Sequence, residues 1–330
     1  MTALPQIGVA AMGGTIAMVR DQRAGLVPAL GADDLVACVP ELRSLARISG
    51  TVITSVGSPS VRFADVLAAC RWARQAVDDG ATGVVVTHGT DTLEETAFLL
   101  NLWWDRPEPV VVTGAMRSPG ESGADGPANL LASVLTVLSP ASRGRGVLVV
   151  MNDQVFAADS VTKTGSFGVE AFASPLGPLG RLYEAEVEYA LTPAHPRPPA
   201  LSIPDGTAWV PIAPTPLGED SRVVEALLAA GADALVLDGV GAGHVPQIMV
   251  DAVERAAQAV PVVMASRTRG GRTGRTTYGY PGAEIDLIRR GVLMTGRLTA
   301  IQARLLLWSL VASGVGDREV IRAEFERRGR

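Results

Sequence analysis

The sequence of 330 residues is poor in several residue types, and each shortage argues against a class of protein. It contains two cysteines, Cys38 and Cys70, both in helix-like stretches, which favours free thiols in a reducing cytoplasm over a disulfide framework. Its three histidines, His88, His195 and His244, are widely separated, and no Cys/His spacing typical of a metal site occurs. We therefore expect neither structural disulfides nor a metal centre.

Charged runs and long apolar runs are missing as well. The net charge is −5 with a pI near 5.4, and no stretch of Lys or Arg forms a basic stripe, so nucleic acid is not an expected partner. Apolar runs such as Gly146–Met151 are far shorter than the ~20 residues that span a bilayer. Ile7–Ala11 runs directly into a glycine pair with no basic segment before it, which is typical of a strand and not of a secretory leader. The sequence predicts a cytoplasmic protein without a membrane anchor.

Short apolar runs alternate with helical patterns along the first two thirds of the chain. The β-branched runs predict buried strands, and the stretches between them have the apolar spacing of helices. Thr92 and Asp125 stand where two of these helices need N-caps. The strands are expected at 7–11, 52–55, 84–87, 110–113 and 147–151, and the helices at 32–39, 64–78, 93–103 and 128–138. This alternation predicts an α/β domain with a mainly parallel sheet.

A proline-rich segment comes next. Residues 191–218 contain eight prolines and no helical period, which fits either a disordered segment or a semi-rigid connection. Because strand and helix patterns resume after it, we interpret it as a linker. It separates a larger domain, residues 1–190, from a C-terminal domain, residues 219–330. The second domain is expected to be a smaller, flavodoxin-like α/β unit.

Polar loops follow three of the predicted strands, at the edge where open α/β sheets bind ligands. The first, Met12–Ala17, has paired glycines that let the backbone approach a ligand, followed by Thr15. A tight turn with Thr15 as a helix cap is the alternative. A phosphate-binding loop is a weaker alternative still, because the GxxxxGK[ST] pattern is missing. The third loop, Thr113–Arg117, ends in an arginine, which is more often an ion-pair partner than a substrate ligand.

The second loop, Thr87–Ala97, concentrates hydroxyl and carboxylate groups beside a glycine. A capping box of Thr92 with Glu95 is expected at the start of the following helix. That box leaves Thr90 and Asp91 without a structural role. These two residues are therefore candidates for chemistry.

Lys163 is the only lysine among 29 basic residues. A lysine in an arginine-rich chain indicates a role that needs the loss of a proton, with chance as the alternative. A threonine nucleophile such as Thr15 needs a base, and a lysine held neutral beside Thr90 and Asp91 could take its proton. Backbone N–H groups around the glycines of the two loops could stabilise an oxyanion. These residues together indicate an amide-hydrolysis site.

The same motifs resemble the double signature of the bacterial-type asparaginase/glutaminase family. The similar segments are Gly13–Ala17, Thr87–Ala97, Gly114–Arg117, Asp125–Leu130, Val161–Thr164, Gly177–Gly180 and Gly291–Gly296, so nearly the whole chain is covered. The resemblance implies a larger N-terminal and a smaller C-terminal α/β domain. It also implies hydrolysis of a small-molecule substrate, L-asparagine, to L-aspartate and ammonia without a cofactor.

The resemblance also implies roles for individual residues. The nucleophile that forms the acyl-enzyme is Thr15, and Thr90, Asp91 and Lys163 assist it, while Asp91 also binds the substrate ammonium group. The substrate is further bound by Gly14, by Ala115 and by Ser58, which holds its carboxylate. The neighbouring subunit contributes Glu284, within a homotetramer built as a dimer of dimers.

Three positions depart from the family pattern. Leu26 stands where the first loop of relatives carries a tyrosine that orients the nucleophile. Pro59 follows Ser58 where a polar residue is common, and His244 replaces the asparagine of a Gly-Asn turn. These changes predict slower catalysis, a different use of Thr90, Asp91 and Lys163, or acceptance of another amide.

Other functions remain compatible with the motifs. One is an amidohydrolase that prefers glutamine or another amide. A second is the ammonia-releasing subunit of tRNA-dependent amidation, but that protein has an additional N-terminal domain, for which we see no room before Gly13. A third is an amino-acid-binding homologue with impaired catalysis. Retention of Thr15, Thr90, Asp91 and Lys163 favours an enzyme over the third.

Overall fold

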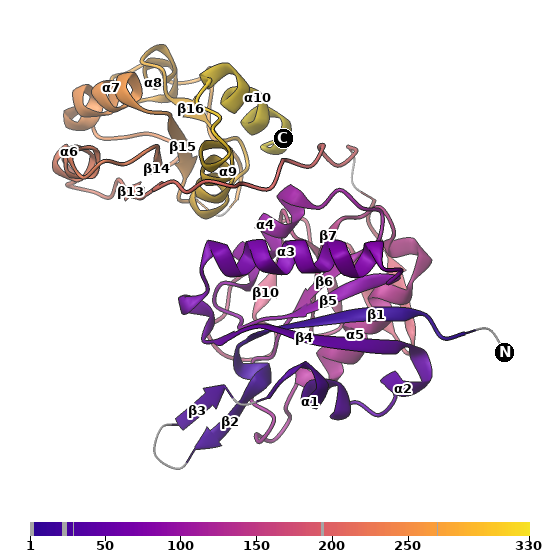
Figure 1. Ribbon diagram of the computed structural model, residues 1–330. Helices are drawn as coiled ribbons and strands as arrows, with labels where there is room; N and C mark the ends of the chain where they lie inside the picture. Colours follow the sequence, from indigo (N-terminus) through magenta and orange to yellow (C-terminus); the bar gives the residue numbers. More distant parts are fainter. Residues whose placement is uncertain (1–2, 22–24, 29, 193–194, 269) are drawn as a thin grey trace. The chain divides into compact units, whose positions relative to one another are not determined.

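A computed structural model describes residues 3–330 except 22–24, 29, 193–194 and 269 (Figure 1). The chain forms two compact units, Met1–Ala200 and Leu201–Arg330, which we call the N-terminal unit and the C-terminal unit. Each unit is an α/β structure, as the sequence predicts.

An eight-stranded sheet forms the centre of the N-terminal unit, with the strand order β12-β11-β8-β7-β6-β5-β1-β4. Its strands are β1 (Gln6–Gly13), β4 (Arg47–Val56), β5 (Gly83–Thr87), β6 (Val110–Thr113), β7 (Val147–Met151), β8 (Gln154–Ala157), β11 (Gly180–Tyr183) and β12 (Glu186–Tyr189). The five strands from β4 to β7 are parallel, and β8, β11 and β12 continue the sheet in antiparallel pairs. The predicted mainly parallel sheet is confirmed.

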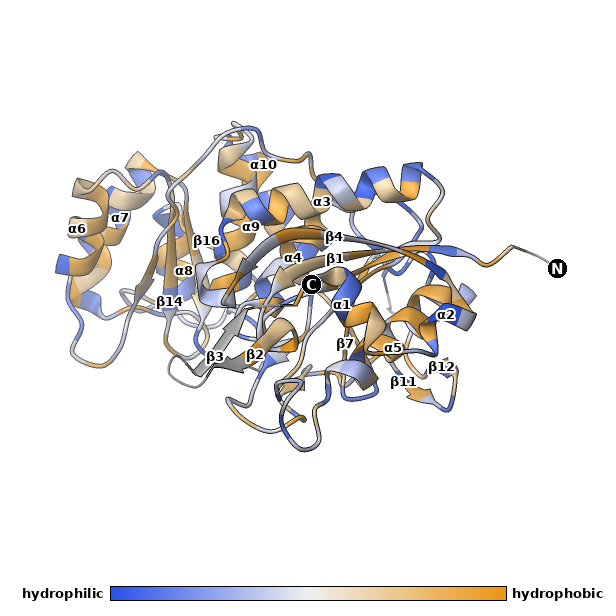
Figure 2. Cartoon of the chain, turned by 60° about the horizontal axis from the view of Figure 1, so that its bottom comes forward, coloured by the Kyte–Doolittle hydropathy of each residue, from blue (hydrophilic) through white to orange (hydrophobic). Residues whose placement is uncertain are grey.

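Helices cover both faces of this sheet. They are α1 (Ala32–Ala37), α2 (Leu42–Leu45), α3 (Phe63–Asp78), α4 (Leu93–Trp103) and α5 (Gly126–Leu138), with short 3-10 turns η1 (Thr15–Ala17), η2 (Ser58–Ser60) and η3 (Pro140–Ser142). α3 and α4 lie on one face, and α1, α2 and α5 lie on the other (Figure 1). α3 buries Val66, Ala69, Cys70 and Ala73, the spacing of one helix face, and its apolar and polar stretches alternate in Figure 2.

Two hairpins stand outside the main sheet. The strands β2 (Met18–Asp21) and β3 (Gly25–Pro28) pair soon after the first polar loop. The strands β9 (Thr162–Lys163) and β10 (Phe172–Ala173) form a second, two-residue pair. Leu26 lies in β3, and its side chain is outside the part of the chain that the structure describes.

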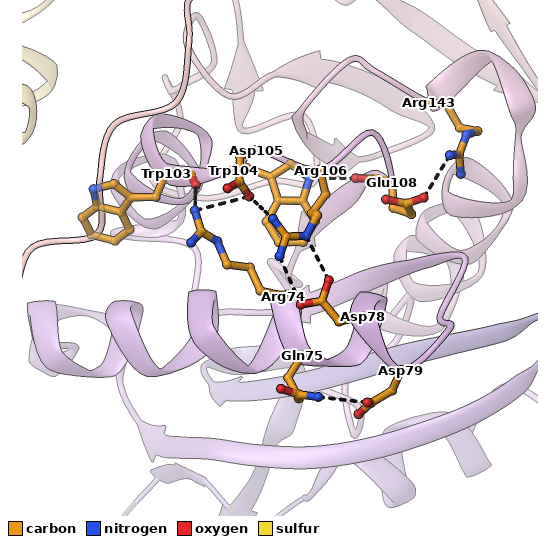
Figure 3. Close-up of polar contacts among 10 residues, drawn as sticks. All are labelled: Arg74, Gln75, Asp78, Asp79, Trp103, Trp104, Asp105, Arg106, Glu108 and Arg143. Atoms are coloured by element: carbon orange, nitrogen blue, oxygen red, sulfur yellow. Dashed lines mark hydrogen bonds and ion pairs between the residues drawn. The ribbon is translucent and has the colours of Figure 1, made fainter.

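Figure 3 shows ion pairs where α4 ends and the chain turns towards β6. Arg106 binds Asp78 of α3 through two hydrogen bonds of 3.0 Å. Arg74, also on α3, donates to the carbonyl of Trp103, and Arg143 pairs with Glu108 at 2.9 Å. Because this turn lies at the amino ends of the parallel strands, the ion pairs hold the edge opposite to the polar loops.

A parallel sheet with the order β13-β14-β15-β16 forms the C-terminal unit. The strands are β13 (Ile212–Pro214), β14 (Leu235–Gly239), β15 (Val262–Ser266) and β16 (Leu293–Met294), and the helices are α6 (Arg222–Ala229), α7 (Val250–Ala259), α8 (Glu284–Arg289), α9 (Ala300–Ala312) and α10 (Arg318–Arg328), with the 3-10 turn η4 (Gln247–Met249). Strand β13 falls inside the proline-rich segment that the sequence indicates as a linker. With three residues and a proline, it fits an edge position, where a missing N–H is tolerated.

Candidate active site

The polar loops that follow β1, β4, β5 and β6 all lie at the carboxyl edge of the larger sheet. These strands are neighbours in the order β6-β5-β1-β4, and they run parallel. Parallel strands bring the loops at their carboxyl ends to one edge. The fold therefore collects four motifs that are far apart in the sequence.

Glycines make the first two loops pack directly on each other. Gly13 and Gly14 have φ values of 81° and 85°, which side-chain-bearing residues rarely adopt. A Cβ on Gly14 would lie 2.2 Å from the Cα of Gly89, so no other residue fits there. Thr15 follows at once as the first residue of η1 and is half-buried. The paired glycines thus hold Thr15 beside the loop that contains Thr90 and Asp91.

Lys163 joins the two candidate residues of the second loop. Its Nζ donates to Thr90 Oγ1 at 2.9 Å and to Asp91 Oδ1 at 2.6 Å. The side chains of Lys163 and Asp91 are 14% and 60% exposed, and Thr90 is 6% exposed as a residue. The lysine is therefore shielded, whereas the carboxylate of Asp91 remains open to solvent.

Ser58 is packed against the same loop. Its Oγ accepts a hydrogen bond from the Asp91 amide at 3.2 Å, and its carbonyl accepts one from Thr92 Oγ1 at 2.8 Å. A Cβ on Gly89 would lie 2.8 Å from the Ser58 Cβ. The structure thus brings together Gly14, Ser58, Thr90, Asp91 and Lys163, with Thr15 next to Gly14 in the chain.

The predicted use of Thr92 as a capping side chain is wrong. Thr92 does occupy the N-cap position of α4, but its side chain makes no capping hydrogen bond to the helix. Its hydroxyl donates to the Ser58 carbonyl instead. A bond to the loop after β4 has replaced the local cap, which a sequence pattern along one segment cannot foresee.

Asp125 is used in a similar way. It is the N-cap of α5 by position, without a capping side-chain bond. Its carboxylate accepts the amides of Met116 at 3.0 Å and Arg117 at 2.9 Å. Asn129, one helical turn later, donates to the Gly114 carbonyl at 3.0 Å. Asp125 and Asn129 therefore hold the third loop, a role that their i,i+4 spacing in the helix could have indicated.

The third loop itself is closely packed. Ala115 is completely buried, and a Cβ on Gly114 would lie 3.3 Å from Thr90 Cγ2. The guanidinium of Arg117 donates to the Gly123 carbonyl at 3.0 Å. This contact supports the interpretation of Arg117 as a structural residue.

His88 lies buried beneath the second loop. One ring nitrogen, Nδ1, is 2.7 Å from the Gly89 carbonyl, and Nε2 is 2.9 Å from the Thr96 hydroxyl. A neutral ring that donates from Nδ1 and accepts at Nε2 satisfies both contacts. Burial lowers the pKa of His88 to about 4 against the smaller, opposing effect of the Gly89 carbonyl. The ring is thus a neutral support for the loop.

Glu284 belongs to the C-terminal unit, where it begins α8 and is completely buried. Its Oε1 accepts the amides of Thr277 at 2.8 Å and Tyr278 at 2.6 Å, and its Oε2 is 2.9 Å from His244 Nε2. The hydroxyl of Tyr280 is 2.9 Å from His244 Nδ1. Burial raises the pKa of Glu284, but the amides of Tyr278 and Thr277 and the imidazole outweigh it and lower the pKa below its usual range.

Among the residues that the structure describes, no three or more His, Cys, Asp or Glu side chains gather in a way that could hold a metal ion. No helix in the described ranges is long and apolar enough to cross a membrane.

The chain matches known proteins along almost its whole length. Residues 6–195 match the asparaginase N-terminal domain family, and residues 210–325 match the glutaminase/asparaginase C-terminal domain family. It is 37% identical to a probable periplasmic L-asparaginase of Haemophilus influenzae, over 98% of this chain and 93% of that one. It is also 37% identical to L-asparaginase 2 of Escherichia coli, over 92% and 88% of the two chains.

A solved structure agrees with these relatives. The crystal structure of a probable cytoplasmic L-asparaginase from Campylobacter jejuni superimposes with a TM-score of 0.87. The two chains are 30% identical, and the match covers 98% of this chain and 99% of that chain. The resemblance seen in the motifs is confirmed, and the chain belongs to the asparaginase/glutaminase family.

Proposed function

We propose that this protein hydrolyses L-asparagine to L-aspartate and ammonia through an acyl-enzyme on Thr15. One observation carries the proposal. The only lysine of the chain, Lys163, bridges Thr90 and Asp91 beside the glycine turn that ends in Thr15. The relatives named L-asparaginase support the choice of substrate.

In the first step the hydroxyl of Thr15 attacks the side-chain amide carbon. Its proton passes through Thr90 to Lys163, which must enter the step in its neutral form. As the C–N bond breaks, the proton is delivered to the leaving nitrogen, and ammonia departs. Water then attacks the acyl-enzyme by the same route in reverse, which releases aspartate and restores Thr15.

Backbone N–H groups are proposed to stabilise the oxyanion. The amide of Gly14 is not available, because it donates to the Val56 carbonyl at 3.2 Å. We therefore assign this role to the segment Gly89–Thr90, which packs on Gly14.

Asp91 and Ser58 are proposed to bind the amino-acid part of the substrate. The Asp91 carboxylate is mostly exposed, so it can accept a bond from the substrate ammonium group while one oxygen stays on Lys163. Ser58 Oγ already accepts the Asp91 amide, which leaves its O–H to donate to the substrate carboxylate. A carboxylate at one end of the site and a hydroxyl donor at the other would select an α-amino acid, because its ammonium and carboxylate groups match them. Gly14 and Ala115 are proposed as further substrate contacts at the walls of the site.

The active form is proposed to be a homo-oligomer, a tetramer built as a dimer of dimers, in which Glu284 of a neighbouring subunit completes the site. Support for a role of Glu284 is its ionised, buried carboxylate at the carboxyl edge of the smaller sheet. We propose a cytoplasmic location because both cysteines are free.

Glutamine is the second candidate substrate, because the matching C-terminal domain family is described as glutaminase/asparaginase. An assay of ammonia release from asparagine, glutamine and the deamino analogue succinamic acid tests both. We expect asparagine to give the highest kcat/KM, and succinamic acid to bind more weakly because it lacks the ammonium group.

Thr15→Ala should abolish turnover in the same assay, while Thr15→Ser keeps a hydroxyl and retains part of it. Circular dichroism and sedimentation should show Thr15→Ala folded and assembled. More than a tenth of the wild-type kcat in Thr15→Ala, a loss below ~1.4 kcal/mol of barrier, would assign the nucleophile to another residue such as Thr90.

A further inference from the structure

Lys163 stands on a strand too short to hold it by itself. Strand β9 contains only Thr162 and Lys163, which pair with Ala173 and Phe172 of β10. Directly after the pair, the amide of Thr164 donates to the Ala171 carbonyl at 2.7 Å. A two-residue pair gives few hydrogen bonds for fixing the position of a long side chain.

Glu94 supplies a further anchor at the backbone of this lysine. Its carboxylate oxygen Oε2 accepts the main-chain N–H of Lys163. Glu94 lies in the first turn of α4, and the loop just before that turn carries Thr90 and Asp91, which accept the Nζ bonds. One segment of five residues thus holds both the backbone and the tip of Lys163.

The helix that carries Glu94, α4, is packed against the sheet. Leu93, Ala97 and Leu100 of α4 are buried, which fixes the helix against the sheet. A carboxylate in the first turn is also stabilised by the positive end of the helix dipole. The anchor is therefore attached to a helix whose first turns are buried against the sheet.

We propose that Glu94 is a positioning residue that sets where Lys163 Nζ lies relative to Thr90. This inference rests on the proposed function of Lys163 in proton transfer. A proton acceptor works only within hydrogen-bond reach, and a displacement of about 1 Å can cost on the order of 10²-fold in rate. Glu94 thereby links the start of α4 to the geometry of the reaction.

Kinetics of four variants test the role. Glu94→Ala should lower kcat on asparagine by about 10²-fold with little change in KM, because substrate contacts remain. Glu94→Gln keeps an oxygen that can accept the Lys163 N–H, so kcat should stay within a few-fold of wild type. Glu94→Asp keeps the charge but is one methylene shorter, so it should fall between the two. Asp65→Ala is the matched control, because it removes a carboxylate-to-amide bond of 2.9 Å at the start of α3.

A second measurement does not depend on catalysis. Lys163 is the only lysine, so an amine-reactive acetylating reagent can label only this side chain and the N-terminus. Peptide mass spectrometry should show faster labelling of Lys163 in Glu94→Ala, whereas Glu94→Gln and Asp65→Ala should match wild type.

The two measurements separate the possible failures. Equal labelling rates in folded wild type and Glu94→Ala would overturn the positioning role, whatever the activity. If Glu94→Ala does not fold, equal labelling and kcat in Glu94→Asp and wild type would overturn it instead. If the wild type releases no ammonia from any amide, but Lys163 is labelled faster in Glu94→Ala than in wild type, the proposed function is rejected. The positioning of Lys163 by Glu94 then still holds.

Discussion

Two residues, Lys163 and His88, illustrate how the site uses charge. Lys163 brings an amino group to a hydroxyl and a carboxylate that lie 73 and 72 positions earlier in the chain. His88, in contrast, is kept neutral by burial, so the loop above it has a rigid support without a second positive charge. Of these two side chains, only Lys163 is proposed to exchange a proton in the reaction.

Replacing Lys163 by arginine tests that proposal. Lys163→Arg should lower kcat by at least 10²-fold, because a guanidinium keeps a positive charge but cannot act as a base at neutral pH. Steady-state ammonia release measures the effect, with Lys163→Met as the variant that removes the charge as well. A Lys163→Arg enzyme with near wild-type kcat would reduce the lysine to a structural cation.

Stability should depend on pH through His88. The pKa of this histidine is about 4 in the folded protein, against 6.5 for a histidine exposed to water, so below pH 6.5 the unfolded chain binds a proton that the folded chain does not. The folded state therefore loses stability as the pH falls from 6.5 towards 4, by up to about 1.4 kcal/mol per pH unit.

Urea unfolding at several pH values measures this slope in wild type and in His88→Gln. We expect the variant to be less stable at pH 7, because its amide replaces the ring imperfectly. Its slope between pH 6.5 and 4 should be shallower than that of wild type. Equal slopes would mean that His88 does not titrate differently on folding.

At the scale of elements, the active site is an assembly of strand ends joined by side chains from helix starts. The N-cap residues of α4 and α5 fix the loops beside them: Thr92 binds the loop after β4, and Asp125 binds Met116 and Arg117 in the loop that leads into its own helix. These bonds join the loops after β4 and β5 and brace the loop after β6. The hairpin β2–β3, which contains Leu26, begins directly after η1 and so follows Thr15 closely in the chain.

Leu26 stands where the family resemblance places a tyrosine, and we expect Leu26→Tyr to raise a low kcat on asparagine. A hydroxyl near the nucleophile typically raises the reaction rate ~10²–10⁴-fold when it takes part in proton transfer. Leu26→Phe, which adds the ring without the hydroxyl, is the control.

Kinetics of Tyr278→Phe and Tyr280→Phe test the alternative that a tyrosine of a neighbouring subunit already replaces this hydroxyl. A fast wild type that slows on Leu26→Tyr would contradict the expectation and favour the alternative.

At the scale of the whole molecule, the C-terminal unit carries Glu284, the residue that is proposed to complete the site of a neighbouring subunit. Glu284 is fully buried in its own unit, with its two oxygens bound by two amides and by His244. The group nearest to solvent in this cluster is Tyr280, which is 53% exposed and contacts His244. The position of the Glu284 carboxylate is therefore set by contacts within its own unit.

The proposed sharing of sites between subunits can be tested by complementation. Thr15→Ala and Glu284→Gln should each be strongly impaired, but mixed subunits should regain activity, because some sites combine an intact Thr15 from one copy with an intact Glu284 from another. Sedimentation should show at least a dimer, and activity should fall on dissociation. An active monomer, or mixtures no more active than their parents, would argue that each site belongs to one chain.

The sequence by itself determined the alternation of strands and helices, the fold class and the residues that are proposed to carry the chemistry. These follow from local properties: the period of apolar residues, the glycine pair before Thr15, and a single lysine among arginines. Such properties act within a few residues, so a linear pattern records them. The same patterns carry the resemblance to the asparaginase/glutaminase family.

Only the tertiary structure decided how side chains are shared between segments. Thr92 sits at the N-cap position that its sequence predicts, yet its side chain binds the loop after β4. Ile212–Pro214 became an edge strand because a partner, β14, lies beside it. The anchor of Glu94 on Lys163 spans 69 positions. Each of these bonds depends on the path of the whole chain, because a hydrogen-bonding group takes the nearest partner in space and not in sequence.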